Sequence, residues 1–173
     1  MRTAADIIKD IQKKIYFPVY FLAGDEPYYI NKISDYIEDN VLEEDEKEFN
    51  STILYGRDVE MSSLISKLKS FPMMSNYQVV IVKEAQDIQQ IDALQPYLDN
   101  PLKSTLLGLA YKYKKVDKRK VFAKTIAKTG VLFESPKLYD NKIPDWISSE
   151  LRKQGFQITP KACFLLAEYL GTS

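Results

Sequence analysis

The chain has 173 residues, of which 45% are hydrophobic, and its 24 basic and 24 acidic side chains leave a formal net charge of zero. That size and composition are typical of one folded domain, or of one domain with part of another, and a neutral chain has no global attraction for nucleic acid or an anionic membrane. Because the sequence contains no histidine and a single cysteine, Cys163, it excludes an internal disulfide, a Cys/His zinc site and Ser-His-Asp or Cys-His catalysis.

The first predicted elements are a helix, a strand and a second helix. A helix predicted over residues 4–15 is followed by a strand at residues 19–23, which ends at Gly24. A second helix begins at Pro27, because proline suits the first helical position. The apolar faces of these helices consist of residues at helical spacing, namely Ile7, Ile8, Ile11 and Ile15 in the first helix and Ile30, Ile33, Ile37 and Val41 in the second.

The next elements lead to a helix that a proline terminates. We interpret the acidic run at residues 43–48 as a solubilising loop and residues 49–55 as a second strand. Asp58 is the expected cap of the helix that follows, and Pro72 ends that helix because the residue before a proline is pushed out of the helical region. The apolar face of this helix contains Met61, Leu64, Ile65 and Leu68.

Three further strands complete the pattern. Residues 79–82 form a continuous apolar run, which is typical of a strand buried on both faces of a parallel sheet. Residues 104–110 and 131–134 are the fourth and fifth strands. A short helix interrupted by Pro96 and a longer helix closed by Gly130 as its C-cap lie between the strands. The apolar positions of these helices are Ile88, Ile91 and Leu94 in the short one and Val121, Phe122 and Ile126 in the long one.

The alternation of strands and helices predicts an α/β fold with a parallel sheet flanked by helices. Beyond residues 135–136 only helices are predicted, so we divide the chain into an α/β domain at residues 1–140 and a helical segment at residues 141–173. Two helices bury their apolar faces poorly alone, so we expect a truncated helical domain and a fragment of a longer protein. The residues that define its helices are Pro144, Trp146, Ile147, Leu151 and Gly155, then Thr159, Pro160, Ala162, Leu165, Leu166, Tyr169, Leu170 and Gly171.

The turn after the first strand is where a domain of this kind would bind a phosphate, because helix N-terminal amides gather there. A P-loop needs a lysine for the phosphates and a hydroxyl for Mg²⁺, and the sequence AGDEPYY has neither in place. Asp25 or Glu26 would cap the helix and repel a phosphate. We therefore expect no nucleotide hydrolysis, no cofactor and no metal, and we interpret Glu84, after the third strand, as a helix-start charge. The alternative is a catalytic carboxylate pair formed by Asp25 and Glu26.

A run of basic residues follows the fourth strand. It contains Lys112, Lys114, Lys115, Lys118, Arg119, Lys120, Lys124 and Lys128. Only Asp117 opposes it, and Tyr111 and Tyr113 alternate with lysines, so one strand face could present rings and the other charge. Two interpretations stay open, a nucleic-acid contact through phosphates and a solvated helix face.

The segment between the proline-terminated helix and the third strand contains Phe71, Met73 and Met74. Methionine fills irregular gaps in cores and also forms adaptable binding surfaces, so both roles are open. Adjacent residues of an extended segment point in opposite directions, and we therefore expect at least one of Met73 and Met74 to be exposed. An exposed apolar side chain on a loop would indicate a protein partner.

Three stretches together resemble the delta subunit family of the bacterial DNA polymerase III clamp loader. They are PVYFLAGDEPYYI, SFPMMSNYQVVIVKEAQ and LLGLAYKYKKVDKRK, and their order and spacing match that family. The resemblance implies an AAA+-like (P-loop-NTPase-like) first domain without a working P-loop, followed by the opening helices of a lid domain. It also implies a non-catalytic subunit of the polymerase holoenzyme that binds and opens the sliding clamp during DNA replication.

In that family an apolar pair just ahead of this strand contacts the clamp. By position the pair falls on Met73 and Met74, with Ser70 and Phe71 just before, and the two methionines depart from the Leu-Phe type of many relatives. The implied partners are the clamp (beta subunit) and, through a collar domain absent here, the other loader subunits. Weak DNA contact would involve Lys112, Lys114, Lys115 and Arg119, and a nucleic-acid-binding module using residues 112–128 is the alternative function. No run approaches the roughly 18 apolar residues of a membrane span, and we expect a cytoplasmic location.

Overall fold

The computed structural model describes residues 2–136, 143–156 and 159–170. The chain divides into two compact units, Met1–Ser135 and Pro136–Ser173. The expected domain boundary at residues 140 and 141 lies outside the described residues, as does Gly171, the expected end of the last helix. Each unit is described by itself.

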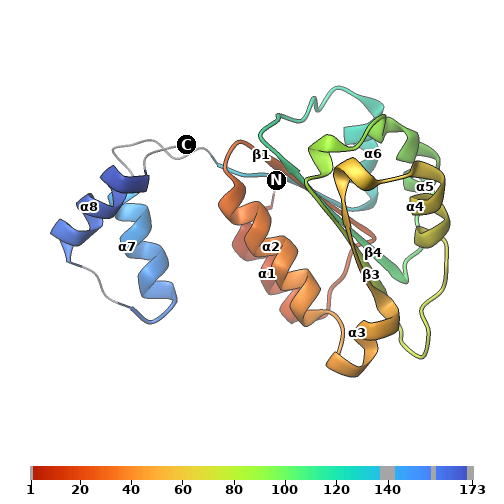
Figure 1. Cartoon of the computed structure of the whole chain (residues 1–173), viewed down its shortest axis with the longest axis horizontal. Coiled ribbons are helices and arrows are strands. Elements are labelled where there is room, and N and C mark those ends of the chain that lie inside the picture. The colour runs from red at the N-terminus through yellow and green to blue at the C-terminus, as the bar shows by residue number, and fades with distance from the viewer. Residues whose placement is uncertain (1, 137–142, 157–158, 171–173) are drawn as a thin grey trace. The chain divides into compact units, whose positions relative to one another are not determined.

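The first unit is built on a sheet of five parallel strands (Figure 1). Their order across the sheet is β2 (Ser51–Tyr55), β3 (Gln78–Lys83), β4 (Thr105–Lys112), β1 (Val19–Gly24) and β5 (Val131–Glu134). In the register of the central strands, Phe21 of β1 lies opposite Leu109 of β4 on one side and Leu132 of β5 on the other. The predicted α/β class and parallel sheet are therefore confirmed.

Helices cover both faces of this sheet, as Figure 1 shows. One face receives α1 (Ala4–Gln12) and α2 (Pro27–Asn40), and the other receives α4 (Met61–Leu68), α5 (Gln95–Asp99) and α6 (Val121–Thr129). Successive residues of β1 point to opposite faces, so it contributes to two cores. Tyr20 and Leu22 pack with the isoleucines of α1 and α2, whereas Val19, Phe21 and Ala23 pack with α4, α5 and α6.

The first helix is shorter than predicted. It ends at Gln12, and Lys14 then adopts a left-handed backbone with φ of 59°. Ile15, expected on the apolar face, lies beyond the helix and is exposed. Ile7 and Ile11 are buried as predicted, and Ile8 is only partly buried.

The acidic run is not a loop, and this prediction was wrong. It forms α3 (Glu44–Asn50), in which the Glu46 carboxylate accepts a 3.0 Å hydrogen bond from the Glu43 backbone amide. Acidic residues in the first turn stabilise a helix through its macrodipole, so the charges favour the helix. As a consequence Phe49 and Asn50 belong to α3, and β2 begins two residues later than predicted.

The cap of α4 also differs from the prediction. Glu60, not Asp58, accepts hydrogen bonds from the backbone amides of Ser62 at 3.2 Å and Ser63 at 2.9 Å. Asp58 instead ends the short 3-10 helix η1 (Gly56–Asp58). The helix ends at Leu68, ahead of Pro72.

The helix expected around Ile88, Ile91 and Leu94 is replaced by shorter turns. These are η2 (Ala85–Asp87), η3 (Ile91–Leu94) and α5. Pro96 lies in the first turn of α5, where its missing backbone amide costs no hydrogen bond, so it begins a helix and does not interrupt one.

Gly130 ends α6, but not through the left-handed conformation that is usual for a C-terminal glycine. Its φ is −147°, and a Cβ added there would lie 2.3 Å from the carbonyl oxygen of Val19. Glycine is needed because the backbone turns into β5 directly against β1. Val121, expected on the apolar face of α6, is exposed, whereas Phe122 and Ile126 are buried.

The second unit contains α7 (Ile143–Lys153) and α8 (Pro160–Leu170). Ile147 and Cys163 are buried between partly buried apolar neighbours, and the Thr159 hydroxyl accepts a 3.2 Å hydrogen bond from the amide of Ala162. Leu165 and Leu166, expected on the apolar face, are exposed, whereas the side chains of Tyr169 and Leu170 lie outside the description. In the described ranges no helix is long and apolar enough to cross a membrane.

Candidate functional site

The turn after β1 is closed by the protein's own groups. Gly24 has φ of 127°, and a Cβ added there would lie 2.2 Å from the hydroxyl of Ser135. The amide of Ser135 donates to the carbonyl of Ala23 at 2.7 Å, which extends the pairing of β1 with β5. The Glu26 carboxylate accepts a 3.2 Å hydrogen bond from the amide of Tyr28 and thereby caps α2. A carboxylate, and not a lysine, therefore occupies the helix end at which a P-loop would bind phosphate.

The acid at the end of β3 belongs to an internal network. Glu84 has a left-handed backbone with φ of 53°, and its carboxylate accepts hydrogen bonds from Gln86 Nε2 at 2.6 Å and Lys112 Nζ at 3.2 Å. These two partners hold the pKa of Glu84 below its usual range. Lys112 is also bound through its backbone amide to Gln86 Oε1 at 3.0 Å. Glu84 precedes the 3-10 helix η2 as expected, and it ties the ends of β3 and β4 together.

The basic residues 112–128 do not form one strand face. Tyr111 lies in β4, and its ring packs 5.0 Å from that of Phe21, whereas Tyr113 lies beyond the strand with a left-handed φ of 65°. The predicted alternation of rings and charges along one strand was therefore wrong. The side chain of Lys112 is only 12% exposed because it pairs with Glu84.

The remaining basic side chains are exposed, and several have acidic or carbonyl partners. Arg119 binds both oxygens of Asp117, at 3.1 and 3.2 Å, and Lys118 lies 3.3 Å from Glu134. Lys114 Nζ lies 3.4 Å from the carbonyl of Gln86. We call these exposed basic side chains the basic patch. They are Lys114, Lys115, Lys118, Arg119, Lys120, Lys124 and Lys128.

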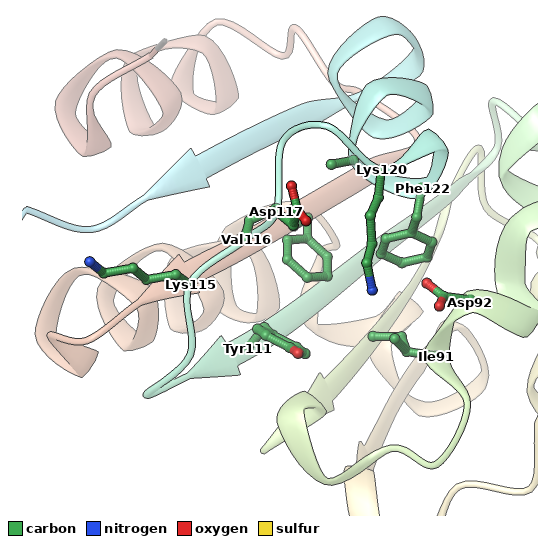
Figure 2. A pocket seen from close by; sticks show the side chains of 10 residues that line it. Ile91, Asp92, Tyr111, Lys115, Val116, Asp117, Lys120 and Phe122 are labelled. Carbon is green, nitrogen blue, oxygen red and sulfur yellow. The ribbon is translucent and has the colours of Figure 1, made fainter.

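A small cavity lies beside this patch and is shown in Figure 2. Its volume is about 150 Å³, which is below the roughly 300–1,000 Å³ typical of small-molecule sites. Phe21, Tyr111 and Phe122 form its aromatic part, with Asp92 and Lys120 as polar members. The ammonium group of Lys115 extends away from the other labelled side chains. In the part of the chain that the structure describes, no cluster of three His, Cys, Asp or Glu side chains could hold a metal ion.

The segment between α4 and β3 presents its apolar side chains to solvent. We call residues 71–74 the apolar loop. Phe71 is 76% exposed, Met73 is 60% exposed and Met74 is 101% exposed. Met74 has a left-handed backbone with φ of 53°, and the hydroxyl of Ser70 donates to the carbonyl of Lys67 at 2.6 Å. The expectation that at least one of Met73 and Met74 is exposed is confirmed, and the structure exposes all three side chains.

Buried side chains bind the backbone of the apolar loop and of Ser70, the residue before it. Asn50, the last residue of α3, bonds to Met73, and Gln78, the first residue of β3, bonds to Ser70. Sequence reasoning missed both residues, because their partners are 23 and 8 positions away and no local pattern relates them. The loop is consequently fixed by polar contacts while its apolar side chains face outward.

Comparison with known proteins identifies the family of this chain. Residues 20–135 match the family model described as DNA polymerase III, delta subunit. The chain is 26% identical over 151 residues to DNA polymerase III subunit delta of Bacillus subtilis, a match that covers 82% of this chain and 44% of that protein.

Solved structures show the same fold. The Bacillus subtilis DNA clamp loader delta protein (YqeN) superposes with a TM-score of 0.74 at 24% identity, covering 95% of this chain and 51% of that one. A DNA polymerase III gamma subunit-related protein of Thermotoga maritima gives 0.56 at 16% identity, covering 95% and 60%. The RuvB Holliday junction branch migration motor of the same organism gives 0.54 at 12% identity, covering 95% and 53%. These neighbours confirm the AAA+-like fold class.

The chain spans about half the length of the delta proteins that it matches. The family model covers most of the chain, including the whole sheet from the second residue of β1 to the end of β5. The resemblance recognised in the sequence is therefore confirmed: this chain belongs to the DNA polymerase III delta subunit family.

Proposed function

We propose that this chain acts in the DNA polymerase III clamp loader as the part of a delta subunit that binds and opens the sliding clamp. The contact is made by Ser70, Phe71, Met73 and Met74. The observation that carries the proposal is the simultaneous exposure of three large apolar side chains on one short, hydrogen-bonded loop. Exposed apolar groups that are close together mark protein interaction sites, because water contact with them is unfavourable.

The apolar loop has the properties of an interface anchor. Fully burying a methionine or phenylalanine side chain contributes about 1.5–3 kcal/mol, and interface hot spots cost 2 kcal/mol or more on truncation. Opening then follows from differential binding. A ligand shifts a two-state equilibrium only by its difference in affinity for the two states. The loop must therefore bind the clamp with one interface opened more tightly than it binds the closed ring.

We propose that the chain contributes no catalysis. Glu26 caps α2 at the position where a nucleotide phosphate would bind, and the turn lacks the P-loop lysine and hydroxyl. Asp25 and Glu26 are accordingly assigned to the helix end and not to an active site. The partners are the sliding clamp and, through a further domain that delta proteins would contribute, the other loader subunits in the cytoplasm.

The test compares Met73→Ala and Met74→Ala with Val121→Ala, which shortens an exposed apolar side chain on α6. Affinity for the purified sliding clamp and melting temperature are measured for each variant. We expect each methionine variant to lose about thirtyfold in affinity with little change in melting temperature, and Val121→Ala to change neither. Large stability losses for both methionine variants, with binding intact in the folded fraction, would overturn the proposal.

A second candidate function is nucleic-acid binding, and the exposed cations at Lys114, Lys115 and Arg119 favour it. Phosphate contacts release counterions, so such binding weakens steeply as salt rises, whereas apolar contacts respond little. We expect weak DNA affinity that charge reversal of the three residues abolishes at low salt. Lys112 is left unchanged in this experiment, because its pairing with Glu84 is internal. Unaltered DNA binding by the triple variant would show that the patch is only a solvated surface.

A further inference from the structure

Two buried amide side chains lie on either side of the apolar loop. Asn50 and Gln78 are each only 2% exposed, which is unusual for these residue types. Burying an amide is unfavourable unless its hydrogen-bonding groups find partners, so the identity of those partners indicates what the amide does. In both cases the partners include the backbone of the segment that leads through the apolar loop.

Asn50 satisfies both polar backbone groups of Met73. Its Oδ1 accepts a 2.7 Å hydrogen bond from the Met73 amide, and its Nδ2 donates to the Met73 carbonyl at 2.8 Å. The second hydrogen of Nδ2 goes to the carbonyl of Glu46 at 3.0 Å, one turn back in α3. One side chain therefore binds Met73 as a neighbouring strand would, and it is itself anchored to a helix.

Gln78 acts at the other end of the loop. Its Nε2 lies 2.6 Å from the Ser70 carbonyl, 3.1 Å from the Lys67 carbonyl and 3.0 Å from Thr105 Oγ1. The Thr105 hydroxyl in turn donates to the carbonyl of Leu68 at 2.9 Å. The last carbonyls of a helix have no partner within it, and here buried side chains of β3 and β4 supply one.

Only Phe71 and Pro72 separate the two anchored residues, Ser70 and Met73. The proline ring fixes one backbone angle of this short connection. The side chains of Phe71, Met73 and Met74 are exposed and contribute little to the cores, so packing of those side chains does not fix the loop. Asn50 instead holds the backbone at Met73, and Gln78 holds it at Ser70, just before the loop.

We propose that Asn50 and Gln78 are positioning residues that hold the apolar loop in its clamp-binding conformation before the clamp arrives. The role in clamp binding rests on the proposed function, whereas the anchoring of the loop by Asn50 and Gln78 can be tested independently of it. A loop already ordered in the free protein loses less conformational entropy on binding, so it binds faster and more tightly.

The variant Asn50→Ala tests the proposal, with Asn40→Ala as the matched control. Asn40 also donates from Nδ2 to a carbonyl one turn back, that of Tyr36 at 3.0 Å, near the end of α2, but it is not bonded to the apolar loop. Three quantities are measured on the whole chain: hydrogen exchange of the Met73 amide, exchange of β1 amides, and the rate and affinity of binding to the purified sliding clamp.

We expect Asn50→Ala to accelerate Met73 exchange and to weaken clamp binding about tenfold, mainly through slower association, while β1 exchange stays unchanged. Asn40→Ala leaves all three readouts unchanged. Faster Met73 exchange with unaltered clamp affinity would overturn the proposal and leave the proposed function standing. If the wild type does not bind the clamp, the proposed function fails, and Met73 exchange still tests the anchoring. If Asn50→Ala does not fold, Met73 exchange in the wild type decides: protection supports the anchor, and exchange at the rate of a free peptide refutes it.

Discussion

Replacing Met74 by glycine should change stability and clamp affinity in opposite directions. Met74 combines a left-handed backbone, φ 53°, with a fully exposed side chain. That backbone conformation costs an ordinary residue about 1–2 kcal/mol, a cost that glycine avoids. The more flexible unfolded chain of the glycine variant costs roughly 0.5–1 kcal/mol of stability, so the net gain from Met74→Gly is about 0–1.5 kcal/mol.

The same substitution removes the whole side chain from the proposed interface. Burying a methionine completely contributes about 1.5–3 kcal/mol, so clamp affinity should fall about 10- to 150-fold. The gain in stability from the backbone is not offset by a packing loss, because an exposed side chain leaves no cavity when it is removed. Selection for folding alone would not keep methionine at this position. A gain in stability together with a loss of clamp affinity would therefore indicate that Met74 serves binding.

Thermal melting and titration with the purified clamp measure the two effects, with Met74→Ala for comparison. Alanine keeps the backbone cost, so Met74→Ala should lose similar affinity without any gain in melting temperature, whereas Met74→Gly gains up to about 6 °C. Unchanged clamp affinity for both variants would show that Met74 is not an anchor. A clear fall in the melting temperature of Met74→Gly would show that its side chain contributes to folding and would refute the reasoning.

Three further outcomes are expected. Gly130→Ala should destabilise by about 1–3 kcal/mol because its Cβ meets the Val19 carbonyl, and in melting experiments it should cost more than Gly108→Ala, whose Cβ meets only the end of the Ile81 side chain. Hydroxyls and amides of two serines lower the pKa of Glu60 to about 2, so its stabilising effect is complete above pH 4.5 and is lost as the pH falls through about 2. Melting curves of Glu60→Gln should therefore converge with those of the wild type toward pH 2. Calorimetry with Mg·ATP should show no binding, and micromolar affinity would contradict our interpretation of the turn after β1.

The central strands could be predicted from the sequence because parallel strands buried on both faces are continuous apolar runs. Residues 19–23 and 79–82 are of this kind, and the structure places β1 and β3 there. The prediction for the acidic run at residues 43–48 was wrong because we took its many charges as a sign of a loop. The spacing of Glu43 and Glu46 is the local signal that could have identified α3, since a carboxylate three residues after the cap can bond back to it.

The proposed clamp-binding surface was only partly predictable. The order of Phe71, Met73 and Met74 after a proline-terminated helix indicated that a large apolar side chain would be exposed, but their number depends on tertiary contacts. Asn50 and Gln78 could not be identified, because the sequence does not distinguish a buried amide side chain from an exposed one. Lys112 was assigned to a basic surface for the same reason, and the structure shows it bound to Glu84.

The turn after β1 and the apolar loop lie at opposite ends of the sheet. In a parallel sheet all carboxyl ends share one edge, and small ligands of α/β proteins bind there. Here the turn after β1 lies at that edge and is closed by Gly24, Ser135 and Glu26. Residues 75–77 connect the apolar loop to the start of β3, so the loop lies at the opposite, amino edge. The clamp contact that we propose therefore does not depend on the turn after β1, since the elements that hold the loop, α3, α4 and the starts of β3 and β4, include no residue of that turn.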